Sequence, residues 1–153
     1  MSIILFAHLM GFALWIGGAI AAMVLAIGAR DETPVVRVGV YRLLARVQTM
    51  VVGVGAMLVV GTGLLLTMRL SQGGAGELMR EPRLWVMQAA GLVGGLMVLL
   101  IGLPAAIKLG GLAVVNDQGE APPAFEMFRR RQAIVSSIAG VLALIALAAW
   151  KLL

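Results

Sequence analysis

The chain has 153 residues, of which 61% are hydrophobic and 12% are charged, and its formal net charge is +5. A soluble domain has far fewer apolar residues, so the composition indicates a membrane protein and leaves no room for a separate soluble domain. There is no cysteine, which excludes disulfides, thiolate metal sites and thiol redox chemistry. The basic residues lie beside apolar segments, so we expect anionic lipid headgroups rather than nucleic acid as their partner.

Four segments contain no Asp, Glu, Lys or Arg, namely 1–29, 47–68, 84–107 and 132–150. A helix needs ~20 residues to cross a hydrocarbon core of about 30 Å. The sequence therefore predicts an all-α polytopic membrane protein, a four-transmembrane-helix bundle that forms a single domain over 1–153. We expect spans at about 2–29, 47–68, 84–107 and 132–150. No basic residue precedes the first span, which is also longer than a signal peptide core, so we expect it to be retained.

The first span carries the only histidine, His8. On a helix His8 shares one face with Gly11, Phe12, Trp15 and Gly18. An ionisable side chain at membrane depth is costly, so it usually faces protein or water and often marks a function. An imidazole bordered by glycines and aromatics could ligate a metal or a flat cofactor. It could equally be a hydrogen-bonded packing residue, and the sequence leaves both readings open.

The second and fourth helices are predicted to begin before their apolar cores. Thr33 and Pro34 are typical of an N-cap followed by proline at the first helical position, and Pro122-Pro123 precedes the fourth helix in the same way. Both helices then start with several arginines. Cations near a helix N-terminus oppose the macrodipole, so lipid phosphate explains these arginines better than helix stabilisation does.

The third span contains Pro104, which removes a backbone donor and should bend the helix. It also contains Gly91-x-x-x-Gly95, a small-residue face that allows close helix packing. Residues 15–18 and 92–95 share a Gly-Gly pattern at an offset of 77, which suggests a weak repeat of two helical hairpins. Under this repeat His8 corresponds to Trp85, so a symmetric bis-histidine site within one chain is excluded.

The basic residues are distributed unequally between the two sides of the predicted bundle. Loops 30–46 and 108–131 lie on one side and carry eight of the twelve basic residues, while loop 69–83 and the C-terminal tail carry the other four. The positive-inside rule then places loops 30–46 and 108–131 in the cytoplasm and both termini on the periplasmic side.

One polar constellation is predicted in the outer half of the bundle. Its members lie at similar depths in the first three spans: His8, Thr62, Thr67, Met68, Met87 and Gln88. Imidazole is a good axial ligand for haem iron, and the thioether of Met68 or Met87 could take the second axial position. Thioethers also suit copper(I), but there is no dense methionine array, so copper fits less well.

The pattern His8-x6-Trp15-x-Gly17-Gly18, followed by Arg-rich starts to the second and fourth helices, resembles a superfamily of small membrane proteins. This superfamily contains the CopD-type copper-resistance proteins and the HemJ-type protoporphyrinogen oxidases. Pro82-Arg83-Leu84-Trp85, at the start of the third helix, adds to the likeness. The specific motif is confined to the first helix.

The resemblance implies haem b at a first-helix histidine, which corresponds to His8, or copper handling. A lysine of the HemJ-type proteins corresponds to a position near Gln88, and glutamine neither carries charge nor titrates. We therefore predict binding rather than protoporphyrinogen oxidase activity. Cofactor binding at His8 with Gly11, Trp15, Gly18, Gln88, Met68 and Met87 is the first hypothesis. A non-catalytic subunit of a larger membrane complex or a homo-oligomer is the second, copper handling is the third, and the bacterial inner membrane is the expected location.

Overall fold

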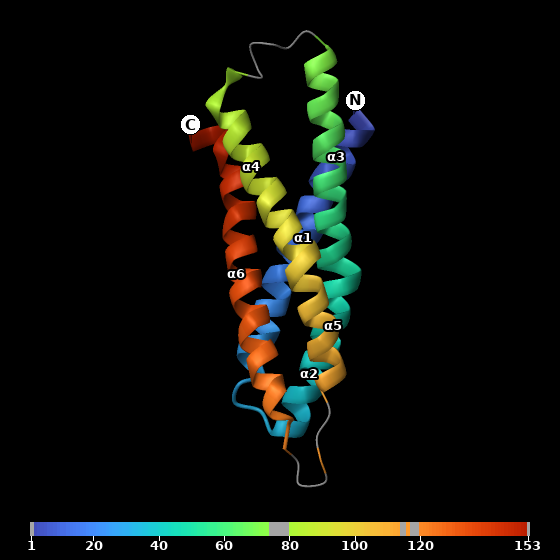
Figure 1. Cartoon of the computed structure of the whole chain (residues 1–153), viewed down its shortest axis with the longest axis vertical. Coiled ribbons are helices and arrows are strands. Elements are labelled where there is room, and N and C mark those ends of the chain that lie inside the picture. The colour runs from blue at the N-terminus through green and yellow to red at the C-terminus, as the bar shows by residue number, and fades with distance from the viewer. Residues whose placement is uncertain (1, 74–79, 114–115, 117–119, 153) are drawn as a thin grey trace.

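The structure, a computed structural model, describes residues 2–73, 80–113, 116 and 120–152. Its elements are α1 (Ser2–Gly28), α2 (Pro34–Val47), η1 (Gln48–Val52), α3 (Gly53–Gln72), α4 (Pro82–Met97), η3 (Val98–Gly102), α5 (Leu103–Leu112) and α6 (Pro123–Leu152). The two η elements are π-helical turns, so α2, η1 and α3 form one continuous helix and α4, η3 and α5 form another (Figure 1). The described residues thus form four long helices and no strand.

All four long helices are apolar and long enough to cross a membrane, over Ile3–Gly28, Pro34–Gln72, Pro82–Leu112 and Pro123–Ala149. This confirms the predicted all-α four-helix membrane bundle, and both termini lie at the same end of it (Figure 1). Three of the helices extend beyond the uncharged segments. Their ends carry charged residues. These side chains can stay in the helices because the helix ends reach past the hydrocarbon region, where water and headgroups solvate the charges.

Proline marks the start of three helices, as predicted for two of them. α2 begins at Pro34, α4 at Pro82 and α6 at Pro123. Proline suits this position because the first N–H groups of a helix have no intrahelical partner. Thr33 occupies the predicted N-cap position, but its side chain makes no capping hydrogen bond.

The second and third long helices are interrupted near their middle by the π-helical turns. In η3 the Leu103 N–H bonds the carbonyl of Val98, five residues earlier, and Pro104 follows at once. Pro104 has no N–H to donate to the carbonyl four residues before it, and the wider π-helical turn accommodates this missing donor. The turn lies where the sequence predicted a bend. The other π-helical turn, η1, is not followed by a proline. Its Gln48 is buried, and within the described part of the chain it is the only residue of the buried set that is classed as polar or charged.

The helices pack as two pairs, α1 with α3 and α4 with α6, while α2 packs against α5 at the opposite end from the termini. Towards the termini the ribbons of α3 and α4 move apart (Figure 1). Small residues allow the close approach within the pairs. A Cβ on Gly55 would lie 2.6 Å from the Trp15 backbone nitrogen, so no larger residue fits between α1 and α3 there.

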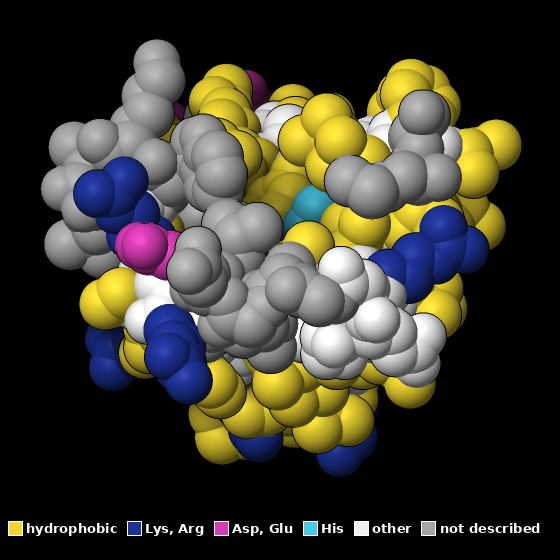
Figure 2. Space-filling view, turned by 90° about the horizontal axis from the view of Figure 1, so that it is seen from above, with side chains coloured by type: hydrophobic (Ala, Val, Ile, Leu, Met, Phe, Trp, Pro, Cys, Tyr) yellow, Lys and Arg dark blue, Asp and Glu magenta, His cyan; other side chains and the backbone are white. Residues whose placement is uncertain are grey.

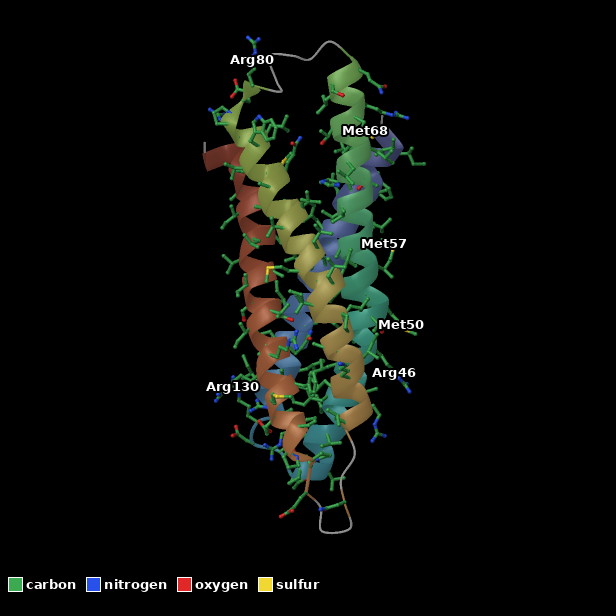
Figure 3. The ribbon with its side chains drawn as sticks, viewed as in Figure 1. Arg46, Met50, Met57, Met68, Arg80 and Arg130 are labelled. Carbon is green, nitrogen blue, oxygen red and sulfur yellow. The ribbon has the colours of Figure 1, made fainter. Side chains whose placement is uncertain are left out.

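Two apolar clusters fill the bundle. The larger surrounds Trp15, which is 1% exposed, and includes Val52 of η1 and Val98 of η3. The smaller lies where α2, α5 and α6 meet, and in it Tyr41 packs edge-on against Phe125 with ring centroids 5.4 Å apart. We call this the basic end, because Arg46 and Arg130 lie there (Figure 3), and we call the other the termini end.

The arginines at the basic end do not all have the same surroundings. Arg42 donates from Nη2 to the carbonyl of Ala113, which follows the last residue of α5, at 2.6 Å. Lys108 lies over the ring of Phe128 at 5.8 Å from its centroid. Arg42 therefore donates a hydrogen bond to a carbonyl at the C-terminus of α5, where a cation is favourable. This structural role was not part of the prediction that lipid phosphate explains the arginines.

Candidate site around His8

His8 lies in the second turn of α1 and faces α3. Its Nδ1 is 2.8 Å from Oγ1 of Thr62, and its ring is partly buried. A Cβ on Gly63 would lie 3.3 Å from Cε1 of His8, so the absence of a side chain at Gly63 lets the imidazole lie against α3. Backbone packing between α1 and α3 thus holds the imidazole beside one turn of α3.

The hydrogen bonds of Thr62 determine which nitrogen of His8 carries the proton. The Thr62 hydroxyl donates its single proton to the carbonyl of Leu58, one turn earlier on α3. It can therefore only accept from His8, which means that the neutral imidazole carries its proton on Nδ1. The imidazole also interacts with the backbone of Val59 on α3. With the proton on Nδ1, Nε2 is the nitrogen that carries the lone pair, which is the form of histidine that binds metals.

A second hydrogen-bonded pair connects α4 to the same stretch of α3. Gln88 donates from Nε2 to Oγ1 of Thr67 at 3.0 Å, and Thr67 donates to the carbonyl of Gly63 at 2.9 Å. His8 and Gln88 thus each bond a threonine of α3, five residues apart in sequence. The predicted polar constellation divides into two pairs on α3, and Gln88 acts there as a donor between helices.

Aromatic rings extend from His8 towards the core. The rings of His8 and Phe12 make an edge-on contact, with their centroids 5.2 Å apart. The ring of Phe12 is in turn nearly parallel to that of Trp15, with a centroid distance of 6.1 Å. Cβ atoms on Gly94 and Gly95 would lie 3.2 and 3.9 Å from Cη2 of Trp15. The indole therefore occupies the space that these two glycines leave, so Trp15 ties α1 to α4.

The predicted glycines of the His8 face lie at helix contacts. A Cβ on Gly11 would lie 2.9 Å from Cβ of Leu58, and one on Gly18 would lie 2.8 Å from Cγ2 of Val52. The neighbouring helices thus fill the space beside both glycines. A flat cofactor therefore has no room beside Gly11 or Gly18.

The two candidate methionines do not lie beside His8 in a comparable way. Met68 is 57% exposed on α3, whereas Met87 packs against the cluster around Trp15. The structure therefore brings His8, Thr62 and Gly63 together, with Gln88 connected to α3 through Thr67.

His8 is visible from the termini end of the molecule. In Figure 2 the cyan side chain of the chain's single histidine is recessed, and the described side chains next to it are hydrophobic. An apolar recess with one imidazole at its base matches the general character of cofactor sites. Within the described ranges no group of three or more His, Cys, Asp or Glu could hold a metal ion.

These observations limit the kind of metal cofactor that the recess could accept. A bare ion needs several protein ligands, which His8 cannot supply alone. Haem brings four nitrogens of its own and needs one imidazole and an apolar surface. The residues present fit haem in this respect, with His8 as the ligand and Phe12 beside it.

Sequence reasoning did not identify the contact of Gly63 with His8. Its only signal was the Gly61-Thr62-Gly63 sequence inside a span, where glycine usually means helix packing. Thr62 bonds the preceding turn of its own helix, as threonines inside spans usually do. Its second role, as acceptor for His8, depends on the register between α1 and α3.

The fold and this site define a multi-pass membrane protein of four helices with one imidazole in a recess at the termini end. Comparisons of the chain with protein-family models, with curated proteins and with solved structures find no match.

Proposed function

We propose that this protein is a membrane module that binds haem b, with Nε2 of His8 as the axial ligand, and that it has a redox-associated role. The observation that carries the proposal is the hydrogen-bond sequence from His8 Nδ1 to Thr62 and on to Leu58, because it leaves Nε2 with its lone pair. Haem supplies one-electron chemistry when it is bound. The chain supplies the ligand, the orientation of the ring and an apolar surface.

His8 is the ligand that the chain offers from the described site, and a second ligand would come from a thioether of Met68 or Met87 or from His8 of a second copy of the chain. Met68 is largely exposed on α3, and Met87 is partly buried against the cluster around Trp15. One imidazole with two methionines is a thin ligand set for a bare copper(I) ion, which favours haem over copper.

Binding is a better proposal than protoporphyrinogen oxidation. Gln88 lies where the resemblance implies a lysine, and its amide already bonds Thr67. A glutamine cannot titrate, so it offers no general acid or base. We place the protein in the bacterial inner membrane with its termini on the periplasmic side, which puts the recess on that side too.

An absorbance spectrum of the purified full-length chain tests the proposal. We expect a Soret band in protein from haem-replete cells, its loss in His8→Ala, and its partial return when imidazole is added to that variant. Thr67→Val is the matched control, because it breaks the Gln88 bond without touching His8 and should keep the band. A folded, colourless wild-type protein from such cells contradicts the proposal.

The alternative is a structural or accessory subunit without a cofactor. One observation favours it: the hydrogen bond to Thr62 and the edge-on contact with Phe12 already satisfy much of the imidazole within the bundle. In that case the protein should copurify with stable partners in mild detergent, and His8→Ala should change stability without changing any spectrum. A monodisperse, coloured particle that contains only this chain contradicts the alternative.

A further inference from the structure

A cavity of about 400 Å³ lies at the basic end, far from His8 along the bundle. Its lining comes from three helices and their flanks: Ala26 and Arg30 at the end of α1, Arg37 and Tyr41 of α2, and Arg129 of α6. Two guanidinium groups from one segment, Arg30 and Arg37, thus border one hollow with a third, Arg129, which is distant in sequence. Arginines placed only to anchor a helix in the headgroup region have no reason to meet in this way.

Two of the three arginines that line this cavity, Arg30 and Arg37, make no ion pair among the described residues. Arg129 pairs with Glu126, whose Oε2 is 2.6 Å from Nη2 and 2.8 Å from Nε. In the described part of the chain this is the only ion pair, so Arg30 and Arg37 have no carboxylate partner there. Asp31 and Glu32 follow Arg30 in sequence and are exposed, without an ion pair to either arginine. An anion in the cavity would offset the mutual repulsion of the guanidinium groups.

Tyr41 gives the cavity a fixed polar wall. Its side chain is 7% exposed, and its ring packs edge-on against Phe125 in the small apolar cluster. Arg129 interacts with the side chain of Tyr41 as well as with Glu126. The aromatic packing of Tyr41 and the ion pair of Arg129 therefore orient two of the groups that face the cavity before any ligand arrives.

We propose that this cavity binds the phosphate group of a phosphate-bearing anion, with Arg30, Arg37 and Arg129 as its ligands and the Tyr41 hydroxyl as a further hydrogen-bond partner. Guanidinium groups suit phosphate because their planar N–H pairs match two of its oxygens at once. Ala26 adds an apolar side at the end of α1, where a span meets the headgroup region. A phospholipid headgroup and a soluble phosphate compound share the chemistry that this site recognises.

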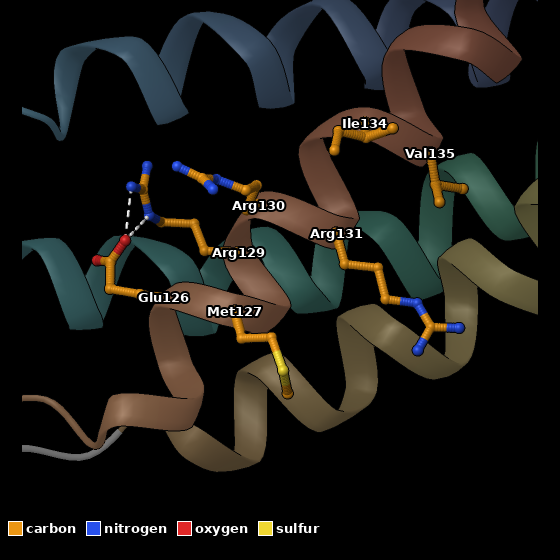
Figure 4. Close-up of a pocket in the computed structure, with 7 residues that line it drawn as sticks. All are labelled: Glu126, Met127, Arg129, Arg130, Arg131, Ile134 and Val135. Atoms are coloured by element: carbon orange, nitrogen blue, oxygen red, sulfur yellow. Dashed lines mark hydrogen bonds and ion pairs between the residues drawn. The ribbon is translucent and has the colours of Figure 1, made fainter.

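A neighbouring cavity does not have the same character. It measures about 590 Å³ and is lined only by residues of α6 between Glu126 and Val135. In Figure 4 the side chain of Arg131 projects away from those of Arg129 and Arg130, so the three consecutive arginines do not converge. Arg129 is the only one of them that also faces α1 and α2 across the smaller cavity.

The test compares two substitutions on the same helix. Binding of phosphatidic acid to the full-length protein in neutral detergent is measured by native mass spectrometry, with diacylglycerol, which lacks the phosphate, as the reference lipid. Arg37→Gln should weaken binding about tenfold or more, as expected for losing charge-assisted hydrogen bonds to one phosphate. Arg46→Gln removes the same charge from α2 outside the cavity and should change binding less than about twofold.

Further arms identify the source of the phosphate and keep the test independent of folding. If millimolar inorganic phosphate displaces phosphatidic acid, a soluble phosphate compound suffices; if it does not, the site requires a lipid headgroup with its chains. Tyr41→Phe retains the ring that packs on Phe125 and should weaken binding without loss of folded protein. Equal effects of Arg37→Gln and Arg46→Gln, or equal binding of diacylglycerol, overturn the proposal.

Discussion

The two ends of this bundle differ in the partners that their polar side chains have. Around His8, towards the termini end, the polar side chains inside the spans are neutral and bond one another, His8 with Thr62 and Gln88 with Thr67. At the basic end the side chains are charged arginines, and most have no carboxylate beside them in the described structure. A neutral polar side chain at membrane depth costs little free energy when it is hydrogen-bonded to another side chain or to a helix backbone. A charged guanidinium group instead needs water, a phosphate or the carbonyls of a helix C-terminus as its partner.

The packing between the two ends explains why each has its own site. The α1–α3 and α4–α6 pairs separate towards the termini, where Figure 2 shows the chain's single histidine recessed. At the basic end α2 and α5 pack together and bring α6 close to α1 and α2. Trp15 and the glycines in the middle hold both arrangements together, so substitutions there should affect both ends.

Trp15→Ala should have the largest effect. It removes an indole that fills the space over Gly94 and Gly95, and we expect the free energy of unfolding to fall by about 4 kcal/mol, as for other buried tryptophans. Thermal unfolding in detergent measures the loss. Trp85→Ala is the control, because Trp85 is 59% exposed and should cost much less. Equal losses from the two variants would contradict the central role of Trp15.

Gly55→Ala should have the next largest effect. Its Cβ would lie 2.6 Å from the Trp15 nitrogen and 2.7 Å from the Gly11 oxygen, and because both are backbone atoms α1 and α3 must separate. We expect a loss of about 2 kcal/mol, in the range of overpacked cores. Gly61→Ala on the same helix is the matched control, because nothing lies within 4 Å of its Cβ position. A neutral Gly55→Ala would show that the α1–α3 contact is looser than described.

The spans and the helix starts were predictable because they depend on local properties. Absence of charge over some twenty residues indicates a span, and Pro34 and Pro123 each follow a polar break, where proline favours the first helical position. The π-helical turns were not predictable in the same way. Pro104 signals a missing donor, but whether the helix bends or widens depends on the neighbours that pack against it.

The two candidate sites were predictable only in part. The sequence predicted that His8 lies in the outer half of the bundle. Spans that are apolar on every face, however, do not indicate which residues of α3 will face α1. The contact with Thr62 and Gly63 is therefore a result of packing register. The cavity at the basic end adds Arg129 of α6 to Arg30 and Arg37, which share one loop, whereas each loop taken alone suggested only interfacial anchoring.

Thr62→Val tests the termini end directly and should have a moderate effect. It removes the acceptor of the His8 proton at nearly constant volume, so we expect a loss of about 1 kcal/mol in unfolding free energy. Because His8 is the only histidine, its ring nitrogens can be observed selectively by ¹⁵N NMR. The wild type should show the proton on Nδ1 and the variant a redistribution between the nitrogens. Thr67→Val should leave the spectrum unchanged, and a wild-type proton on Nε2 would contradict the hydrogen-bond assignment.

Arg42→Gln should have the smallest effect and tests the basic end. Arg42 donates to the Ala113 carbonyl at the end of α5 and is itself exposed, so we expect a loss of only about 0.5 kcal/mol. Because this contribution is structural, the loss should persist in detergent without any phosphate lipid. Arg37→Gln should show the reverse pattern, with no loss in neutral detergent and a loss of stabilisation when phosphatidic acid is added. If both variants depend on the lipid in the same way, the arginines of α2 form one diffuse basic surface rather than a helix cap beside a phosphate site.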